Sequence, residues 1–154
     1  MRRTKTWLLM LFIAFAVIQF IQPARNQSGQ VLQTDITKVY PVPAGVRTIL
    51  ESACYDCHSN TTRYPWYSYI QPAGWWLVSH IREGKEELNF SDFGSYSSKR
   101  RISKLRSIES SIHDGTMPLS SYTSLHKEAR LTEEEKQLVT AWAGKLRDSL
   151  AAAN

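Results

Sequence analysis

The segment 54–58, CYDCH, contains both cysteines of the 154-residue chain, with two residues between them and a histidine directly after the second. A close cysteine pair has four common uses: a structural zinc site, a redox-active dithiol, a disulfide, and covalent attachment of haem. Each use demands a different environment in the fold. The other residues that can reach this segment therefore decide between them.

Three of the four uses fit poorly. A zinc site needs two more ligands, and no two of His80, His113 and His126 are three to five residues apart. A thioredoxin-type dithiol is expected beside a β-α-β unit, and the sequence has no convincing strand pattern. A disulfide across two intervening residues would close a small strained loop and would leave His58 without a role.

Covalent haem attachment uses the pattern Cys-x-x-Cys-His. Two thiols on one helical turn can add to the two vinyl groups along one porphyrin edge, and the next residue is carried beneath the iron. The sequence therefore predicts one haem c, attached through thioether bonds to Cys54 and Cys57, with His58 as the proximal iron ligand.

The distal iron ligand must come from elsewhere in the chain. Met117 is the only methionine after residue 10, and it lies between Gly115, which permits a turn, and Pro118, which stiffens the chain. Methionine ligation would raise the reduction potential. His80 is the alternative distal ligand, because it falls on the apolar face of an expected helix. The interpretation that we favour for His80 is a buried histidine bonded to a backbone carbonyl or to a haem propionate.

Aromatic residues are concentrated between the cysteine motif and that helix. Residues 60–74 contain four aromatic rings, two prolines and a glycine, which predicts an irregular loop around an apolar group. We therefore expect Tyr64, Trp66 and, on the following helix, Trp76 to contact the cofactor. His113 and His126 flank Met117 and are expected to orient it or to face solvent.

The periodicity of apolar residues predicts an all-α fold. Helices are expected over 43–54, 74–88, 101–114 and 132–150, with a short helix within 115–131. The last begins with a capping box, Thr132 and Glu135. No segment shows an internal repeat.

The first 22 residues differ from the rest of the chain. A positively charged start precedes an apolar run from Trp7 to Ile21, which is broken only by Gln19. We favour an uncleaved N-terminal membrane anchor, a transmembrane helix, over a removed signal peptide. The positive-inside rule then places the remainder outside the cytoplasm. Residues 23–40 are expected to form a linker and 41–150 the folded domain.

The net charge of +5 belongs mainly to this leader. Four of the 19 basic residues flank the apolar run, which leaves 15 against 14 acidic residues in the rest of the chain. No basic stripe large enough for nucleic acid remains. The basic stretch 99–106, KRRISKLR, is either a solvated helix face or a docking patch for an acidic redox partner.

Three stretches together resemble a known family: ACYDCHSN at 53–60, IQPAGWWL at 70–77 and GTMPLSSY at 115–122. They are similar to the exported, membrane-anchored haem-binding-domain proteins of Gram-negative bacteria, monohaem relatives of class I cytochromes c. The similarity runs from about residue 41 to 145. It implies a small cytochrome c-like helical domain, with Cys54 and Cys57 for attachment, His58 as proximal ligand and Met117 as distal ligand. The helix with Trp76 and His80 departs from ordinary class I cytochromes.

The predicted function is covalent haem binding and one-electron transfer at the periplasmic face of the bacterial inner membrane. The expected partners are redox proteins and, through residues 1–22, the membrane. The alternative is a haem peroxidase or a gas or redox sensor with a displaceable sixth ligand. No separate catalytic constellation is present, which favours a carrier over an enzyme.

Overall fold

The structure, a computed structural model, describes residues 2–153, and its regular elements are helices. Within these residues no β-strand forms, and Gln27 and Thr61 make one isolated bridge. The all-α prediction is confirmed. The elements are α1 (Arg2–Ile18), α2 (Ile36–Val39), α3 (Ala44–Ala53), α4 (Tyr55–His58), η1 (Trp66–Tyr69), α5 (Ala73–Glu87), η2 (Phe90–Ser95), α6 (Ser98–His113), α7 (Ser120–Leu125), η3 (Lys127–Ala129) and α8 (Glu133–Ala152), where η denotes a 3₁₀ helix.

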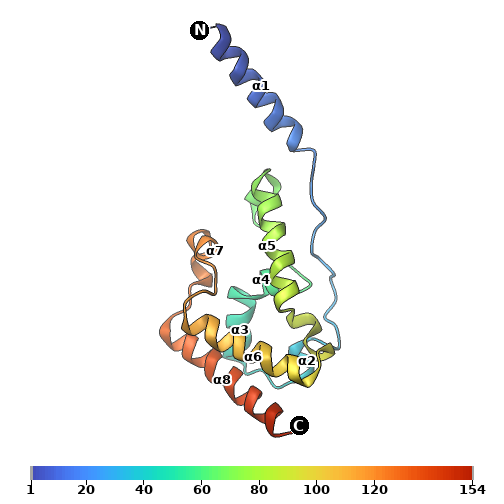
Figure 1. Cartoon of the computed structure of the whole chain (residues 1–154), viewed down its shortest axis with the longest axis vertical. Helices are drawn as coiled ribbons and strands as arrows, with labels where there is room; N and C mark the ends of the chain where they lie inside the picture. The colour runs from blue at the N-terminus through green and yellow to red at the C-terminus, as the bar shows by residue number, and fades with distance from the viewer. Residues whose placement is uncertain (1, 154) are drawn as a thin grey trace.

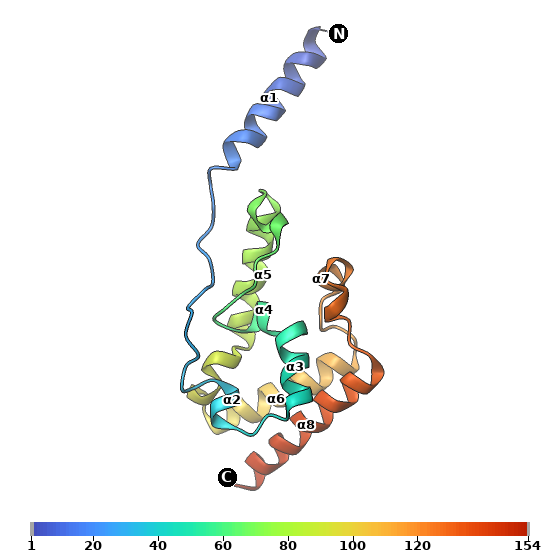
Figure 2. The same ribbon diagram turned by 180° about the vertical axis from the view of Figure 1, so that it is seen from behind.

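Helices α6 and α8 pack along each other and form the base of the domain, and α3 packs across α8 (Figure 1). From this base α5 and α7 rise on opposite sides, with α4 between them, as the reverse view also shows (Figure 2). The core lies where α3, η2, α6 and α8 meet. Its members include Val46, Ile49, Leu50, Phe90, Phe93, Leu105, Ile108, Ile112, Val139 and Trp142.

Two of these helices follow directly from sequence patterns. In α3 the predicted apolar stripe, with Val46 and Leu50 fully covered, faces the core. In α8 the predicted capping box is confirmed. The backbone N–H of Glu135 donates to the Thr132 hydroxyl over 3.2 Å, and the Glu135 carboxylate accepts from the Thr132 backbone N–H over 2.8 Å.

Helix α6 begins three residues earlier than the sequence pattern indicates. Ser97 is its N-cap residue, and its hydroxyl accepts from the backbone N–H of Arg100 over 3.4 Å. The segment before it, expected to be a loop, contains η2. This short element places Phe90 and Phe93 fully inside the core.

The predicted linker is attached to the domain more firmly than its polar composition indicates. Asp35 caps α2 by accepting from the Thr37 backbone N–H over 2.9 Å, and Ile36 is completely buried in the core. Farther back, the Ser28 N–H donates to the Asn60 carbonyl over 3.0 Å. These contacts dock parts of the segment before α3 onto the folded domain.

Among residues 2–153, no helix is both long enough and apolar enough to cross a membrane. Helix α1 has 17 residues, whereas a span needs about 20. The apolar run continues to Ile21, but the helix ends at Ile18 and the next residues form turns. The transmembrane helix predicted within residues 1–22 is therefore not found; Met1 of that segment lies outside the described residues.

Candidate functional site

The cysteine motif forms a single turn of helix, α4. Cys54 precedes it, and the Cys54 carbonyl accepts from the backbone N–H groups of Cys57 over 3.2 Å and His58 over 2.9 Å. Both cysteines are unpaired and partly buried. The predicted helical turn thus brings both thiols and the imidazole to one short element.

The environment of the thiols keeps them neutral. Burial raises the pKa of the Cys54 thiol to about 12, with a smaller contribution from Cys57. Burial likewise raises the pKa of Cys57 to about 11, and the charge of Asp56 adds to this effect. Redox-active cysteine pairs have lowered thiol pKa values, so this site lacks the electrostatics of a dithiol oxidoreductase.

The imidazole of His58 is held in one tautomer. Its Nδ1 lies 2.9 Å from the carbonyl oxygen of Leu88, at the end of α5. A carbonyl can only accept, so Nδ1 carries the proton and Nε2 keeps its lone pair. Metal-binding histidines are usually oriented in this way by a carbonyl or carboxylate.

Two cavities meet at this histidine. The first, of about 320 Å³, includes Cys54 in its wall, and the second, of about 340 Å³, includes Cys57. Such volumes are typical of ligand pockets. Both cavities are lined by Ala53, His58, Glu87, Met117 and Pro118. The fold therefore brings His58 and Met117 together from distant parts of the chain, with one thiol in each cavity.

The wall of the first cavity is mainly apolar. It is built from the core faces of α3, η2, α6 and α8, and its apolar residues include Leu50, Leu88, Phe90, Ile108, Ile112, Leu131 and Val139. Their helical periodicity marks most of them as core positions in the sequence. Nothing in that pattern distinguishes a wall that faces a ligand from one that faces another helix.

Met117 lies on the short segment between α6 and α7. Gly115 ends α6 with φ of 66°, in the left-handed region that glycine adopts without strain. The backbone N–H of Met117 then donates to the Ser111 carbonyl over 3.2 Å. This bond anchors the backbone of Met117, while 37% of the residue remains exposed.

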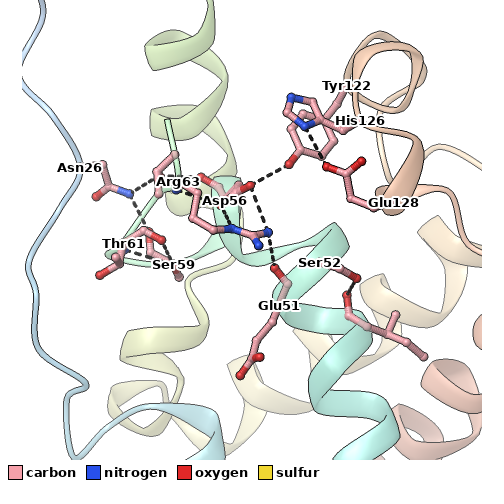
Figure 3. Close-up of polar contacts among 12 residues, drawn as sticks. Asn26, Glu51, Ser52, Asp56, Ser59, Thr61, Arg63, Tyr122, His126 and Glu128 are labelled. Carbon is pink, nitrogen blue, oxygen red and sulfur yellow. Dashed lines mark hydrogen bonds and ion pairs between the residues drawn. The ribbon is translucent and has the colours of Figure 1, made fainter. Parts of the chain in front are cut away.

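A polar cluster connects α7 to the cysteine motif (Figure 3). Asp56 lies between the two cysteines, and its carboxylate accepts from the Tyr122 hydroxyl over 2.7 Å. The same carboxylate accepts from the backbone and side chain of Arg63 at 3.0 and 3.3 Å. Burial, followed by the bond to Asp56, raises the pKa of Tyr122. Tyr122 is five residues after Met117, so this cluster fixes the Met117 segment relative to α4.

The two histidines that flank Met117 have different surroundings. His126 stacks on Tyr122, with ring centroids 4.3 Å apart, and its Nε2 lies 2.8 Å from the Tyr67 hydroxyl. It therefore helps to hold α7 against the loop that follows α4. The side chain of His113 is 87% exposed and is paired with Asp114. It faces solvent.

His80 lines the second cavity together with Met117. Its ring packs edge-on against Trp76, with centroids 4.4 Å apart, and its Nδ1 lies 3.7 Å from a Glu83 carboxylate oxygen. Its Nε2 is buried and has no hydrogen-bond partner among the residues that the structure describes. The expected carbonyl bond is therefore not made.

The aromatic residues expected around the cofactor do not line the two cavities at His58. Trp66 is 76% exposed and Trp76 is 52% exposed, and neither lines the two cavities at His58. Tyr64 lines a separate cavity, where its hydroxyl accepts from the Asn26 backbone N–H over 2.8 Å. Trp76 contacts the ring of His80, which itself lines the second cavity, whereas Tyr64 faces the N-terminal segment.

The basic stretch on α6 is partly committed to contacts inside the protein. Arg101 donates to the Tyr40 hydroxyl and the Gly94 carbonyl at 2.9 and 2.6 Å. Lys104 is 3.3 Å from Glu87 and lines the first cavity. Arg100 lies over the Tyr96 ring. Of these three side chains, only Lys104 is paired with a carboxylate in the contacts described, so a docking role for this stretch stays a prediction.

Helix α5 approaches the cysteine motif most closely at Gly84. A Cβ at this position would lie 2.9 Å from the Cys57 carbonyl oxygen and 3.3 Å from Cys57 Cβ. We expect Gly84→Ala to lower the free energy of unfolding by about 1–3 kcal/mol, because backbone would have to shift. Gly45→Ala is the control, since its Cβ would meet only the side chain of Leu138, at 3.2 Å. Equal denaturation midpoints for the two variants would contradict the expectation.

The donor set fits an iron porphyrin. Two neutral thiols, an imidazole with a free Nε2 and a thioether sulfur meet around two adjoining cavities. The first cavity also has mainly apolar walls. Fold and site thus define the class of a small helical haem-binding protein.

Comparisons with known proteins agree with this class. A family model described as a haem-binding domain matches residues 13–145, most of the chain. The chain therefore belongs to the haem-binding domain family. It is also 29% identical over 107 residues to cytochrome c peroxidase Ccp of Escherichia coli (strain K12). That match covers 68% of this chain but only 23% of the relative. No solved structure matches.

Proposed function

We propose that this protein binds one haem c covalently and transfers single electrons at the periplasmic face of a bacterial inner membrane. The observation that carries the proposal is the convergence of four groups: His58 and Met117 share both cavities, and Cys54 and Cys57 lie on either side. The proposal rests on haem-binding family membership and on the chemistry of these side chains.

Each group has a separate role in the proposal. The thiols of Cys54 and Cys57 form the thioether bonds, His58 is the proximal ligand through Nε2, and Met117 is the distal ligand. When bound, haem c supplies an iron centre that changes charge by one electron. The Leu88 carbonyl keeps the His58 ring in the ligating tautomer. The apolar walls exclude water and thereby help to set the potential.

The location and the partners are also part of the proposal. Export is consistent with c-type haem, which is attached outside the cytoplasm. The large apolar side chains of α1, from Trp7 to Val17, are exposed and offer a surface for lipid. We expect a single N-terminal membrane attachment and redox proteins as partners. The near-neutral domain gives no support for a nucleic-acid partner.

A second candidate function is a haem peroxidase or sensor. The relevant observation is the buried, unpartnered Nε2 of His80 in the same cavity as Met117. If the bond from Met117 were displaced, His80 could accept a proton there or bind iron itself. The similarity to a protein named as a cytochrome c peroxidase is consistent with this candidate, although this chain spans 23% of that relative.

Carbon monoxide distinguishes the two candidates. We expect the reduced full-length protein to keep its six-coordinate spectrum under carbon monoxide, because Met117 occupies the distal position. A redox titration of the same sample should give a single one-electron wave. Rapid, stoichiometric carbon monoxide binding would favour the peroxidase or sensor.

The Asp56–Tyr122 bond provides a finer test of the distal assignment. Tyr122→Phe removes the hydroxyl that binds the Asp56 carboxylate and leaves the ring that stacks on His126. A hydrogen bond to a charged group contributes about 1.5–3 kcal/mol, so the Met117 segment should open about tenfold more often or more. Carbon monoxide, which does not bind the parent detectably, should then bind the reduced variant. Tyr64→Phe is the control, because its hydroxyl bonds Asn26 instead of α7. Carbon monoxide binding that stays undetectable in both variants would contradict a positioning role for Tyr122.

A further inference from the structure

One end of the domain exposes a cluster of large apolar side chains. Trp66, Tyr69, Ile70 and Trp76 are 76%, 58%, 41% and 52% exposed, and they lie on η1, directly after it or in the first turn of α5. We call these four residues the aromatic tip. Single exposed apolar residues are normal, but several grouped together mark a surface that contacts another phase or molecule.

The residues beside the aromatic tip are hydrogen-bonded to the segment that follows α1. Gln71, which follows the tip residue Ile70, is completely buried. Its backbone N–H donates to Gln19 Oε1 over 2.8 Å, and its side-chain amide donates to Gln22 Oε1 over 3.0 Å. The indole N–H of Trp75 donates to the Ile21 carbonyl over 2.8 Å. Figure 1 shows this end of α5 pointing toward α1.

These bonds determine how far the aromatic tip lies from α1. Breaking the bonds of the buried Gln71 is costly, because its polar groups would be left without partners away from water. Phe20 and Ile21, which lie between Gln19 and Gln22 in the bonded segment, are 88% and 59% exposed. The apolar surface of α1 therefore continues across the bonded segment onto the aromatic tip.

We propose that the aromatic tip inserts into the headgroup region of the bilayer that receives α1. This rests on the membrane attachment in the proposed function. If the apolar part of α1 is in lipid, Gln19 and Gln22 lie where the chain enters water, and Gln71 is bonded to both. Trp and Tyr favour this interface, because their rings are apolar and their N–H or O–H groups remain hydrated.

The consequence is a fixed orientation of the domain. Helix α5 starts at the aromatic tip and leads to the second cavity, where His80 and Gly84 lie roughly 10 and 16 Å along its axis from Ala73, at 1.5 Å per residue. The proposed haem site is then held at a defined height above the membrane. A bilayer, and not a soluble protein, is the occupant because the surface is continuous with α1.

Spin labels test this orientation in the full-length protein with haem attached. Single nitroxides are placed by Trp66→Cys, Tyr69→Cys, Leu11→Cys and Ser149→Cys, and each protein is reconstituted in phosphatidylethanolamine–phosphatidylglycerol nanodiscs. Collisions with oxygen report lipid, and collisions with a water-soluble nickel chelate report water. An unchanged haem spectrum shows that each variant is folded.

We expect labels at 66 and 69 to lose nickel accessibility and gain oxygen accessibility in nanodiscs, with position 149 remaining accessible to nickel. A lipid-like signal at 11 with water-like signals at 66 and 69 would overturn this inference and leave the membrane attachment intact. A water-like signal at 11 would overturn both. Shielding at 66 and 69 that persists without lipid would indicate a protein contact and would also overturn it.

Discussion

Replacement of both Cys54 and Cys57 by serine is expected to abolish covalent haem and to leave most of the helical structure unformed. The cavities lie among α3, α4, α5, η2, α6 and α8, so their apolar walls would face water in the absence of the cofactor. A domain of this size has little core to spare, and a ligand bound only by the folded state contributes its binding energy to stability. Far-UV circular dichroism measures the loss.

The single variants are the matched controls for this effect. Cys54→Ser and Cys57→Ser each keep one thiol, so one thioether bond can still form beside an intact His58. Both should retain part of the haem and much of the helical signal. A double variant with a native-like circular dichroism spectrum would contradict a structural role for the cofactor.

Met117→Ala is expected to change the coordination and the reduction potential of the iron while leaving the haem attached. Loss of the thioether sulfur should remove the far-red sulfur-to-iron charge-transfer band of the oxidised protein and lower the reduction potential. Carbon monoxide binding to the reduced protein should change from undetectable to stoichiometric. Absorption spectroscopy and a redox titration measure both effects.

Two control variants test whether this result is specific to Met117. Met10→Ala removes another methionine, in α1, and should leave the band unchanged. His80→Ala should also keep the band, because it removes only the alternative distal ligand and leaves the Met117 sulfur in place. A band that survives in Met117→Ala, or that is lost in His80→Ala, would contradict Met117 as the distal ligand.

The features that the sequence predicts depend on residues that are close together in the chain. The pattern Cys54, Cys57 and His58 requires only one turn of helix to bring the three groups to α4. The capping box at Thr132 and the apolar stripe of α3 depend on residues three or four apart, and both are confirmed. Met117 was singled out because few methionines exist in the chain, and the structure brings it to the same cavities as His58.

The features that the sequence does not predict depend on distant contacts. The Leu88 carbonyl that orients His58 is a backbone group 30 residues away, and no side-chain pattern marks it. Trp66 and Trp76 were expected to contact the cofactor from composition, but composition does not determine which residues line a cavity, and neither lines the two at His58. The buried Gln71 bonds to Gln19 from another part of the chain, which only the fold reveals.

Mass spectrometry of the denatured full-length protein tests the central claim most directly. The account predicts that the intact chain carries the added mass of one haem, and that digestion places this mass on the peptide containing Cys54, Cys57 and His58. A chain with the unmodified mass, isolated from cells that attach haem to other c-type proteins, would contradict covalent attachment at this site.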